Sequence, residues 1–458
     1  MRNPMTTFQR IIAFILVAAT STSYAADGTY TVVVSQQTNK KPAWKKVVQT
    51  LVEKHEAQVI VFENQVGHSL PQLTKQFPKY VCFVSTPAET TTEFVAAVHQ
   101  LTRKLDDDPY TDTYWGILTG FDAANALSIA EHREPLTIHK VASGTEIALQ
   151  CCTEGLWYDE LVKNKLVQKK RGAAAKQLRG PDDTTSALVD TLNQYQADLF
   201  VTSGHATEGD WMIGFRYRNG FFRSKAGQMF GIDTSNTRID IDSTNPKVYL
   251  PIGNCLMGNI NGPDAMALAW MNDVGVKQMI GYTVPTWYGY QGWGILDYFI
   301  EQPGRYTMNQ AFFANHHALV HRLSESTTST GDKRGLKFDR DVVAFYGDPA
   351  WSAKMANGQN RFEQTIDSGQ NSMTFTITPN QGEASFDTVN NNGSQRGGRP
   401  FVGFFDQRIE HIKITRGHEL HPIVTDNFIL VPRPSTCDPT KEYKVTFTFE
   451  LLNWCAIP

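Results

Sequence analysis

A histidine and a cysteine each follow a short apolar run in this chain. Residues 198–205 read DLFVTSGH and end at His205, and residues 248–255 read VYLPIGNC and end at Cys255. Each run is rich in β-branched and aromatic residues and predicts a buried strand that stops at a reactive side chain. The carboxyl ends of neighbouring parallel strands form the crevice where ligands bind. If these two strands are neighbours, a thiol and an imidazole meet there, as nucleophilic cysteine catalysis requires.

Such a site also needs backbone donors for the oxyanion and room for tight turns. Gly204 directly precedes His205, Gly253 lies two residues before Cys255, and both glycines permit such turns. The N–H groups of Cys255 and of a residue beside His205 are candidates for the oxyanion hole. The alternative is a loop histidine and a buried core thiol, and spacing alone does not separate the two hypotheses.

Strand-like and helical patterns alternate from residue 29 to about residue 351. Helical spacing of apolar residues covers 44–56, 91–105, 123–130, 184–195, 264–272 and 308–323. Short apolar runs between them read as strands, among them 31–34, 59–62, 80–84, 114–118 and 278–282. This alternation predicts an α/β fold, a mostly parallel sheet with helices on both faces.

The pattern changes after Trp351. From residue 362 onward only strand-like runs occur, at 373–377, 401–405, 409–414, 428–431 and 444–451. Polar turns separate them, including the stretch NNNG at 390–393. Short strands at this spacing predict an all-β, immunoglobulin-like sandwich. The expected division is a signal peptide at 1–25, an N-terminal α/β subdomain at 26–110, the catalytic domain at 111–357 and the sandwich at 358–458.

The first 25 residues have the pattern of a secretory signal peptide. Arg2 and Arg10 precede or flank an apolar stretch at 11–20, and Ser23, Tyr24 and Ala25 offer a cleavage site. The apolar stretch is too short to span a bilayer, and no later stretch reaches a spanning length without charges. We therefore expect a secreted or periplasmic protein without a membrane span.

Charge argues against one class of partner. The formal net charge is −3, whereas nucleic-acid binders usually carry a basic footprint. Hydrophobic residues make up 41% of the chain, so a large core can form. Nucleic acid is therefore not an expected partner. The cysteine-peptidase hypothesis makes protein or peptide substrates the expected partners, and nothing in the sequence indicates the oligomeric state.

The segments around both reactive residues resemble motifs of the gingipain family, caspase-like (clan CD) cysteine peptidases. The matching stretches are SGHATEGDW at 203–211, IGNCLMG at 252–258, PYTD at 109–112, 278–293 and YGDP at 346–349. The resemblance covers residue 79 to the C-terminus and implies a caspase-like catalytic sheet followed by a sandwich. It implies that Cys255 is the nucleophile, that His205 is its base or imidazolium partner, and that the activity is that of an endopeptidase.

The resemblance also implies further site residues. The N–H groups of Cys255 and Ala206 would form the oxyanion hole, although Ala206 stands where the clan usually has glycine. Residues 282–290 match the segment that lines the substrate pocket in this clan, which makes Trp287, Tyr288 and Tyr290 the expected substrate-binding residues. The stretch 212–247 is long for the family and predicts an inserted hairpin at 218–220.

The acid that would orient His205 is not identified, and Glu208 and Asp210 are candidates by proximity alone. The reaction requires no cofactor and no metal ligand. The resemblance also implies an optional structural calcium ion. Its candidate ligands are the carboxylates of Asp339, Asp341 and Asp348, or those of Asp240 and Asp242.

Two rival functions remain open. One is a zinc hydrolase, because His317 and His321, close to His316, share a helical face at a spacing that suits zinc. Ala318 replaces the glutamate of the usual zinc-hydrolase motif, so a polar helix face is the alternative interpretation. The third hypothesis is a non-catalytic binding or adhesion protein on the same scaffold.

Cysteine usage predicts one disulfide. Cys437 and Cys455 are the two cysteines of the expected sandwich, and export would bring them into an oxidising compartment. A bond between them would close a loop of about 18 residues, which is worth roughly 3 kcal/mol in the chain-entropy model. Mass spectrometry of the exported protein under non-reducing conditions should show the two peptides linked; two free thiols would contradict the prediction.

Overall fold

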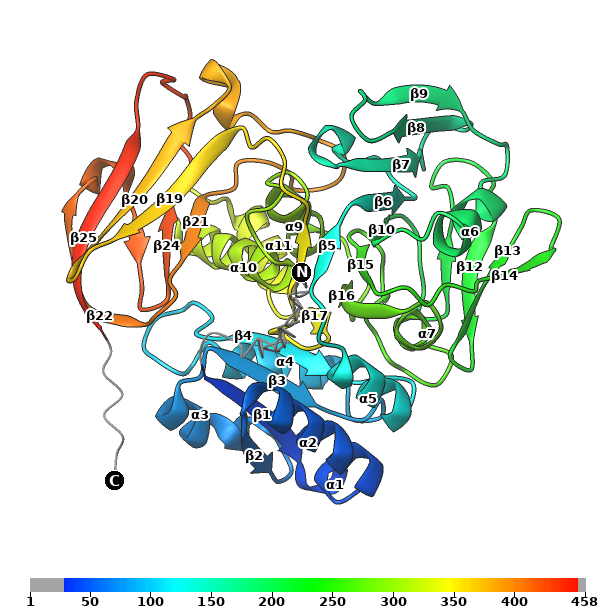
Figure 1. Ribbon diagram of the computed structural model, residues 1–458, viewed down its shortest axis with the longest axis horizontal. Helices are drawn as coiled ribbons and strands as arrows, with labels where there is room; N and C mark the ends of the chain where they lie inside the picture. Colours follow the sequence, from blue (N-terminus) through cyan, green and yellow to red (C-terminus); the bar gives the residue numbers. More distant parts are fainter. Residues whose placement is uncertain (1–28, 452–458) are drawn as a thin grey trace, which may run out of the picture.

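The computed structural model describes residues 29–451, and one large sheet forms its centre (Figure 1). Its strands are β1 (Tyr30–Ser35), β2 (Gln58–Phe62), β3 (Tyr80–Val84), β4 (Tyr114–Leu118), β6 (Lys140–Ser143), β7 (Glu154–Tyr158), β8 (Lys165–Lys169), β9 (Lys176–Arg179), β10 (Leu199–Thr202), β15 (Lys247–Pro251), β16 (Val276–Tyr282) and β17 (Val343–Tyr346). They lie in the order β2-β1-β3-β4-β17-β16-β15-β10-β6-β7-β8-β9.

Most neighbouring strands of this sheet are parallel. The antiparallel pairs among the described residues are β16/β17, β7/β8 and β8/β9. The prediction of a mostly parallel α/β sheet is therefore confirmed. Because β16 and β17 run in opposite directions, the strands on the two sides of this junction point their carboxyl ends to opposite edges of the sheet.

The helices fall mainly where apolar spacing predicts them. They are α1 (Gln36–Asn39), α2 (Pro42–His55), α3 (Leu70–Gln76), α4 (Thr92–Leu101), α5 (Ala123–Glu131), α6 (Thr185–Asn193), α7 (Met266–Asp273), α8 (Tyr290–Trp293), α9 (Ile295–Phe299), α10 (Met308–Ser324) and α11 (Thr330–Asp339). Side-chain caps fix several of their starts, as at α10, where Thr307 and Gln310 form a capping box. Within the described residues, no helix combines the length and apolar character needed to cross a membrane.

The stretch between the two motifs forms a sheet of its own. Its antiparallel strands are β11 (Asp210–Met212), β12 (Phe221–Lys225), β13 (Gln228–Ile232) and β14 (Arg238–Asp240). Strands β11 and β12 form an antiparallel hairpin whose connection, residues 213–220, includes the predicted turn at 218–220. A second, tighter turn at 226–227 joins β12 to β13. Asn219 in the first connection accepts a hydrogen bond from the backbone N–H of Thr184 and donates one to its hydroxyl, so it also supports the start of α6.

The C-terminal part consists of two antiparallel sheets. One contains β19 (Phe362–Ser368), β20 (Ser372–Pro379), β25 (Tyr443–Leu451) and β22 (Ile409–Arg416); the other contains β21 (Phe401–Phe404), β24 (Phe428–Val431) and β23 (Ile423–Val424). A separate apolar core, rich in phenylalanine, connects the two sheets. Their immunoglobulin-like character and the division of the chain into four segments stay predictions.

Helices join this part to the large sheet. In Figure 1, α9, α10 and α11 lie between the central sheet and the C-terminal strands. On α10, the His317 ring stacks on Phe428 of β24 at 4.1 Å between ring centres. A short parallel pair, β5 (Leu136–Ile138) with β18 (Ala353–Met355), lies beside the large sheet. The signal-peptide prediction and Cys455 lie outside the described residues, so neither export nor the disulfide is tested.

A buried ionic cluster connects the first and last elements of the large sheet. Asp348 follows β17 and accepts hydrogen bonds from Lys54 Nζ and His55 Nε2 of α2, both at 2.8 Å. Its other oxygen accepts the Tyr30 hydroxyl of β1 at 2.9 Å. Burial by itself raises the pKa of Asp348. The contacts with Lys54 and then His55 outweigh burial and hold this pKa far below its usual range.

Replacing Asp348 by Asn should destabilise the fold by about 3–5 kcal/mol, since it leaves the buried Lys54 ammonium without its ionic partner. The sign of the pKa change means that the Asp348 contribution is present above pH ~4 and is lost as the pH falls further. Urea unfolding of both proteins at pH 7 checks this, with the exposed Asp367→Asn as control. Equal midpoints for Asp348→Asn and wild type would contradict the prediction.

Candidate active site

Strands β10 and β15 are neighbours in the sheet and run parallel. Their register pairs Leu199 with Val248 and Thr202 with Pro251, so both strands end at the same edge. His205 and Cys255 follow these ends within a few residues, on adjacent loops. The structure thus brings the two sequence-predicted residues to one sheet edge, while their catalytic role stays a prediction.

Asn254 fixes the two loops to each other. Its Nδ2 donates to the Gly204 carbonyl at 3.0 Å, and its Oδ1 accepts the Thr202 hydroxyl at 2.6 Å. The backbone N–H of Ile252 also donates to the Thr202 carbonyl at 2.9 Å. The fully buried Asn254 side chain, next to Cys255 in the chain, is therefore hydrogen-bonded to the segment that precedes His205.

The Cys255 thiol is partly buried and faces the loop after β16. Its Sγ accepts the N–H of Thr286 at 3.2 Å and lies 3.7 Å from the carbonyl oxygen of the same residue. Leu256, the next residue, has a positive φ of 58°, which turns the chain sharply after the thiol. A partly accessible thiol with a backbone donor at its sulfur is the environment of a reactive cysteine rather than of a core residue.

The two expected oxyanion donors are available. Neither the N–H of Ala206 nor that of Cys255 donates a hydrogen bond to another group within residues 29–451. The loop of Ala206 is held by its neighbours, since Met212 N–H donates to the His205 carbonyl at 3.0 Å and Thr207 N–H to that of Asp210 at 2.9 Å. Two unused N–H groups beside a thiol and an imidazole can receive a developing negative charge.

The His205 imidazole is exposed and lies on an aromatic ring. Its ring centre is 4.6 Å from that of Phe215, with an interplanar angle of 28°. Phe215 is held in turn by its N–H, which donates to the Glu160 carbonyl at 2.7 Å. Gly204, just before the histidine, has a φ of +87°, a conformation that side-chain-bearing residues rarely adopt.

Glu160 is a buried carboxylate directly behind this histidine loop. Its Oε1 accepts the hydroxyls of Ser203 at 2.5 Å and Thr145 at 2.8 Å. Its Oε2 has no hydrogen-bond partner within the described residues and would lie 3.0 Å from a Cβ placed on Gly204. Burial raises the pKa of Glu160, and the two hydroxyl donors oppose that shift. An unpartnered buried carboxylate oxygen beside a catalytic-type histidine is a candidate for orienting it.

Sequence reasoning missed Glu160. The available signal was the acidic pair Asp159–Glu160 directly after the apolar strand β7, at the same sheet edge as His205. The two acids considered from sequence lie elsewhere: Glu208 accepts Asn259 Nδ2 at 3.2 Å, and Asp210 begins β11.

The three aromatic residues expected to bind substrate occupy different environments. Trp287 is 54% exposed and follows Thr286, the contact of the Cys255 sulfur. Tyr288 is buried and donates its hydroxyl to Asp332 at 2.8 Å. Tyr290 is 2% exposed, with the Arg399 guanidinium 3.7 Å above its ring. Of the three, Trp287 alone is exposed, and its ring packs on one side against Phe338 at 5.5 Å between ring centres.

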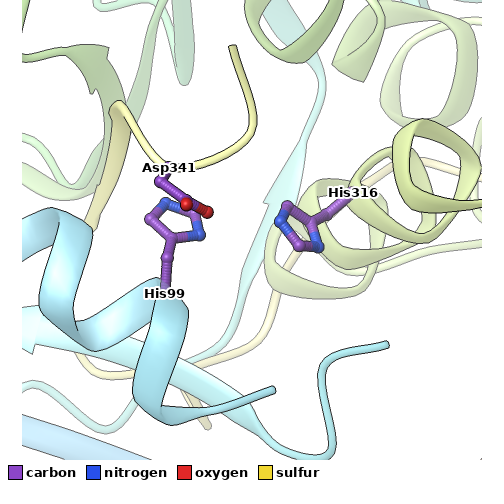
Figure 2. A group of neighbouring side chains, drawn as sticks. All are labelled: His99, His316 and Asp341. Atoms are coloured by element: carbon purple, nitrogen blue, oxygen red, sulfur yellow. The ribbon is translucent and has the colours of Figure 1, made fainter. Parts of the chain in front are cut away.

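Of the α10 histidines considered for zinc, His316 and His317 are buried in the core, whereas His321 is partly exposed and lies 3.6 Å from Glu325. His316 lies near His99 and Asp341, and each of the three offers a ligand atom within 4.8 Å of the others (Figure 2). Asp341, however, is ion-paired with Arg103 at 2.8 Å and Arg340 at 2.9 Å. Two guanidinium groups oppose a buried divalent cation here, so we assign no metal to this cluster.

The carboxylates considered for calcium do not form a common site among the described residues. Asp341 and Asp348 are already neutralised by side-chain cations, as described above. Asp339 is buried under Tyr282, whose hydroxyl donates to it at 3.1 Å, and burial raises its pKa to about 6. Asp240 pairs with Arg238 at 2.7 Å on the surface. A structural calcium ion therefore stays a prediction.

Comparisons with known proteins give little guidance. No protein-family model matches the chain, and no curated protein matches it. Among solved structures, the complex of the pro- and mature domains of RgpB from Porphyromonas gingivalis is similar with a TM-score of 0.48 and 11% sequence identity. The alignment covers 92% of this chain and 97% of that chain.

The buried histidines predict acid sensitivity. Burial lowers the pKa of His317 to about 3, whereas an unfolded histidine titrates near 6.5. The unfolded chain therefore takes up this proton first, and stability falls as the pH drops from ~6.5 toward 3. Replacing His317 by Phe keeps the stacking on Phe428 and removes the titration. It should reduce the stability lost between pH 7 and pH 4.5 by about 2–3 kcal/mol.

Urea unfolding at the two pH values measures this difference. Exposed His68→Gln is the control and should leave the wild-type pH dependence unchanged. An identical loss in wild type and His317→Phe would show that His317 does not contribute.

Proposed function

We propose that this protein is an exported cysteine endopeptidase that cleaves peptide bonds with a Cys255/His205 dyad. The proposal includes the caspase-like character of the catalytic sheet and the immunoglobulin-like character of the C-terminal sheets. It rests on one observation above the others: the Asn254 side chain joins the loops of His205 and Cys255 at the shared edge of β10 and β15.

In the first half of the reaction, His205 takes the thiol proton and the Cys255 thiolate attacks the scissile carbonyl carbon. A carbon–sulfur bond forms, and the carbonyl electron pair moves to the oxygen. The N–H groups of Ala206 and Cys255 stabilise that oxyanion. When the intermediate collapses, the carbon–nitrogen bond breaks and His205 gives its proton to the leaving amine.

In the second half, water cleaves the thioester. His205 takes a proton from the water as its oxygen attacks the same carbonyl carbon. The oxyanion forms again, the carbon–sulfur bond breaks, and the carboxyl product leaves. The proton on His205 returns to the sulfur, which restores the starting state.

Glu160 orients the imidazole in this proposal. Its unpartnered Oε2 lies against Gly204, and its backbone carbonyl holds Phe215 under the His205 ring. An acid in this place favours one tautomer of the histidine and stabilises the imidazolium form. Neither Glu208 nor Asp210 is assigned this role.

Substrate contacts and location complete the proposal. The exposed Trp287, next in the chain to the sulfur contact Thr286, would contact the side chain of the residue before the cut, with the buried Tyr288 and Tyr290 supporting its loop. The reaction uses no cofactor, and we assign no calcium site. Export to the periplasm or the exterior rests on the signal-like pattern of residues 1–25.

Replacing Cys255 by Ala should abolish peptide hydrolysis, and replacing His205 by Ala should lower kcat by about 10²–10⁴-fold. Glu160→Gln keeps the shape and removes the charge, so it should also lower kcat, by up to about 10⁴-fold with KM little changed. A fluorogenic peptide library measures these rates. Glu208→Gln is the matched control and should retain wild-type turnover.

A peptide chloromethyl ketone separates the candidate functions. A peptidase forms one covalent adduct at Cys255, which mass spectrometry locates, and Cys255→Ala forms none. A binding protein on the same scaffold gives no adduct, and a zinc hydrolase loses its activity with chelator instead. Full activity of Cys255→Ala would end the proposal.

A further inference from the structure

A long connection between β20 and β21 reaches from the C-terminal sheets to the candidate active site. Figure 1 shows this connection in orange, and it includes residues 387–400. From sequence, its NNNG stretch predicts only a polar turn. In the structure its residues contact both sides of the catalytic edge.

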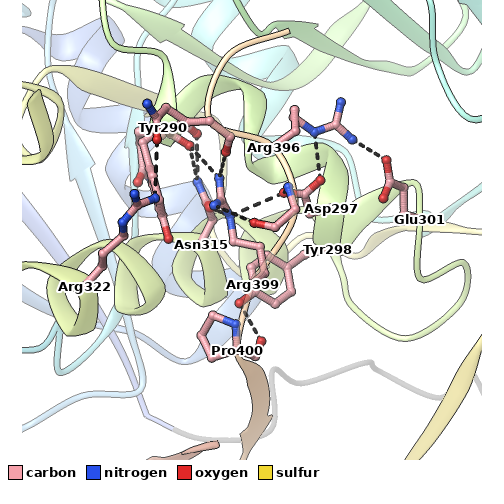
Figure 3. Close-up of polar contacts among 12 residues, drawn as sticks. Tyr290, Asp297, Tyr298, Glu301, Asn315, Arg322, Arg396, Arg399 and Pro400 are labelled. Atoms are coloured by element: carbon pink, nitrogen blue, oxygen red, sulfur yellow. Dashed lines mark hydrogen bonds and ion pairs between the residues drawn. The ribbon is translucent and has the colours of Figure 1, made fainter. Parts of the chain in front are cut away.

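Two buried arginines anchor the connection. Arg396 Nε donates to Asp297 Oδ1 at 2.7 Å, and the same guanidinium is ion-paired with Glu301 (Figure 3). Arg399 Nε donates to Asn315 Oδ1 at 3.0 Å, and its guanidinium lies over the Tyr290 ring. Both arginine side chains are at most 2% exposed, so the connection is fixed to α8, α9 and α10.

Gly393 contacts the cysteine side of the site through a tryptophan. A Cβ on Gly393 would lie 2.2 Å from the Trp293 ring, and its φ is +96°. On the other side, a Cβ on Gly253 would lie 2.7 Å from Trp293 Nε1. The Trp293 ring therefore packs tightly against Gly393 and against Gly253, two residues before Cys255.

Asn392 contacts the histidine side through hydrogen bonds. Its Nδ2 donates to the Thr145 hydroxyl at 3.0 Å and to the Glu146 carbonyl at 3.2 Å. The Thr145 hydroxyl in turn donates to Glu160 Oε1 at 2.8 Å. Since the hydroxyl has one proton, the bond from Asn392 leaves that proton directed at Glu160.

We propose that Asn392 and Gly393 are positioning residues for the dyad, supplied by the C-terminal β part of the chain. Asn392 holds Glu160 through Thr145, and Gly393 holds Trp293 against the Cys255 loop. The inference rests on the proposed function, because it takes Cys255 and His205 as the reacting groups. It makes the C-terminal sheets part of the catalytic unit rather than an appended module.

The test compares Asn392→Ala and Asn392→Asp with Asn391→Ala and Asn391→Asp. The exposed neighbour Asn391 makes no hydrogen bond within residues 29–451, so it is a matched control. The readout is the alkylation rate of Cys255 by iodoacetamide at pH 7 and pH 9, followed by mass spectrometry. His205→Ala supplies the rate without the imidazole, which should be at least about ten-fold below wild type at pH 7.

Both Asn392 variants should lose about three- to ten-fold of the pH 7 alkylation rate and about ten-fold or more of kcat. Their pH 9 alkylation rate and KM should stay within two-fold of wild type, since a free thiolate forms there without help. Gly393→Ala should show the same pattern. Alkylation of the fully buried Cys82 reports loosening of the fold and should stay negligible in every variant.

The outcomes separate the two proposals. If His205→Ala slows Cys255 alkylation and the Asn392 variants do not, the positioning role is overturned and the dyad stands. If His205→Ala leaves the wild-type rate unchanged, the dyad is overturned and the positioning role with it. If Cys82 becomes reactive toward iodoacetamide in the Asn392 variants, these substitutions loosen the whole fold. Asn392 then has a general structural role and the proposal fails.

Discussion

The parallel pairing of β10 with β15 is the constraint on which the candidate site depends. The pair places two strand ends at one edge, and the buried Asn254 then fixes the distance between the loops that follow. A shift of one residue in this register would turn every side chain of one strand to the other face. The thiol and the imidazole would then leave the same crevice, whatever the loops did.

The sequence predicts the parts of the site that lie next to strong local patterns. His205 and Cys255 follow buried apolar runs, and such runs predict strands and the places where they end. The mostly parallel sheet follows from the alternation of strands and helices in the same way. The order of the strands cannot be predicted in this way, because no local sequence pattern indicates that β17 lies between β4 and β16.

The rest of the site depends on contacts between distant segments. Glu160 gains its position from Ser203 and Thr145, which no spacing rule connects to it. Tyr290 looks like a pocket residue in sequence, yet Arg399 covers its ring from the C-terminal part. Asn219 lies in the predicted turn, but the sequence does not show that its side-chain amide also bonds to Thr184 at the start of α6. A polar side chain with a distant partner does not show that partner in its local sequence.

The link between residues 392–393 and the dyad also bears on the order in which the chain folds. Contacts between residues far apart in sequence form slowly, since a long loop must close before they are made. Residues 392–393 are synthesised well after Cys255, so a growing chain holds the thiol and the imidazole before it holds their C-terminal support. Under the proposed function, full reactivity would then appear only after residues 392–393 have been made and have packed against Thr145 and Trp293.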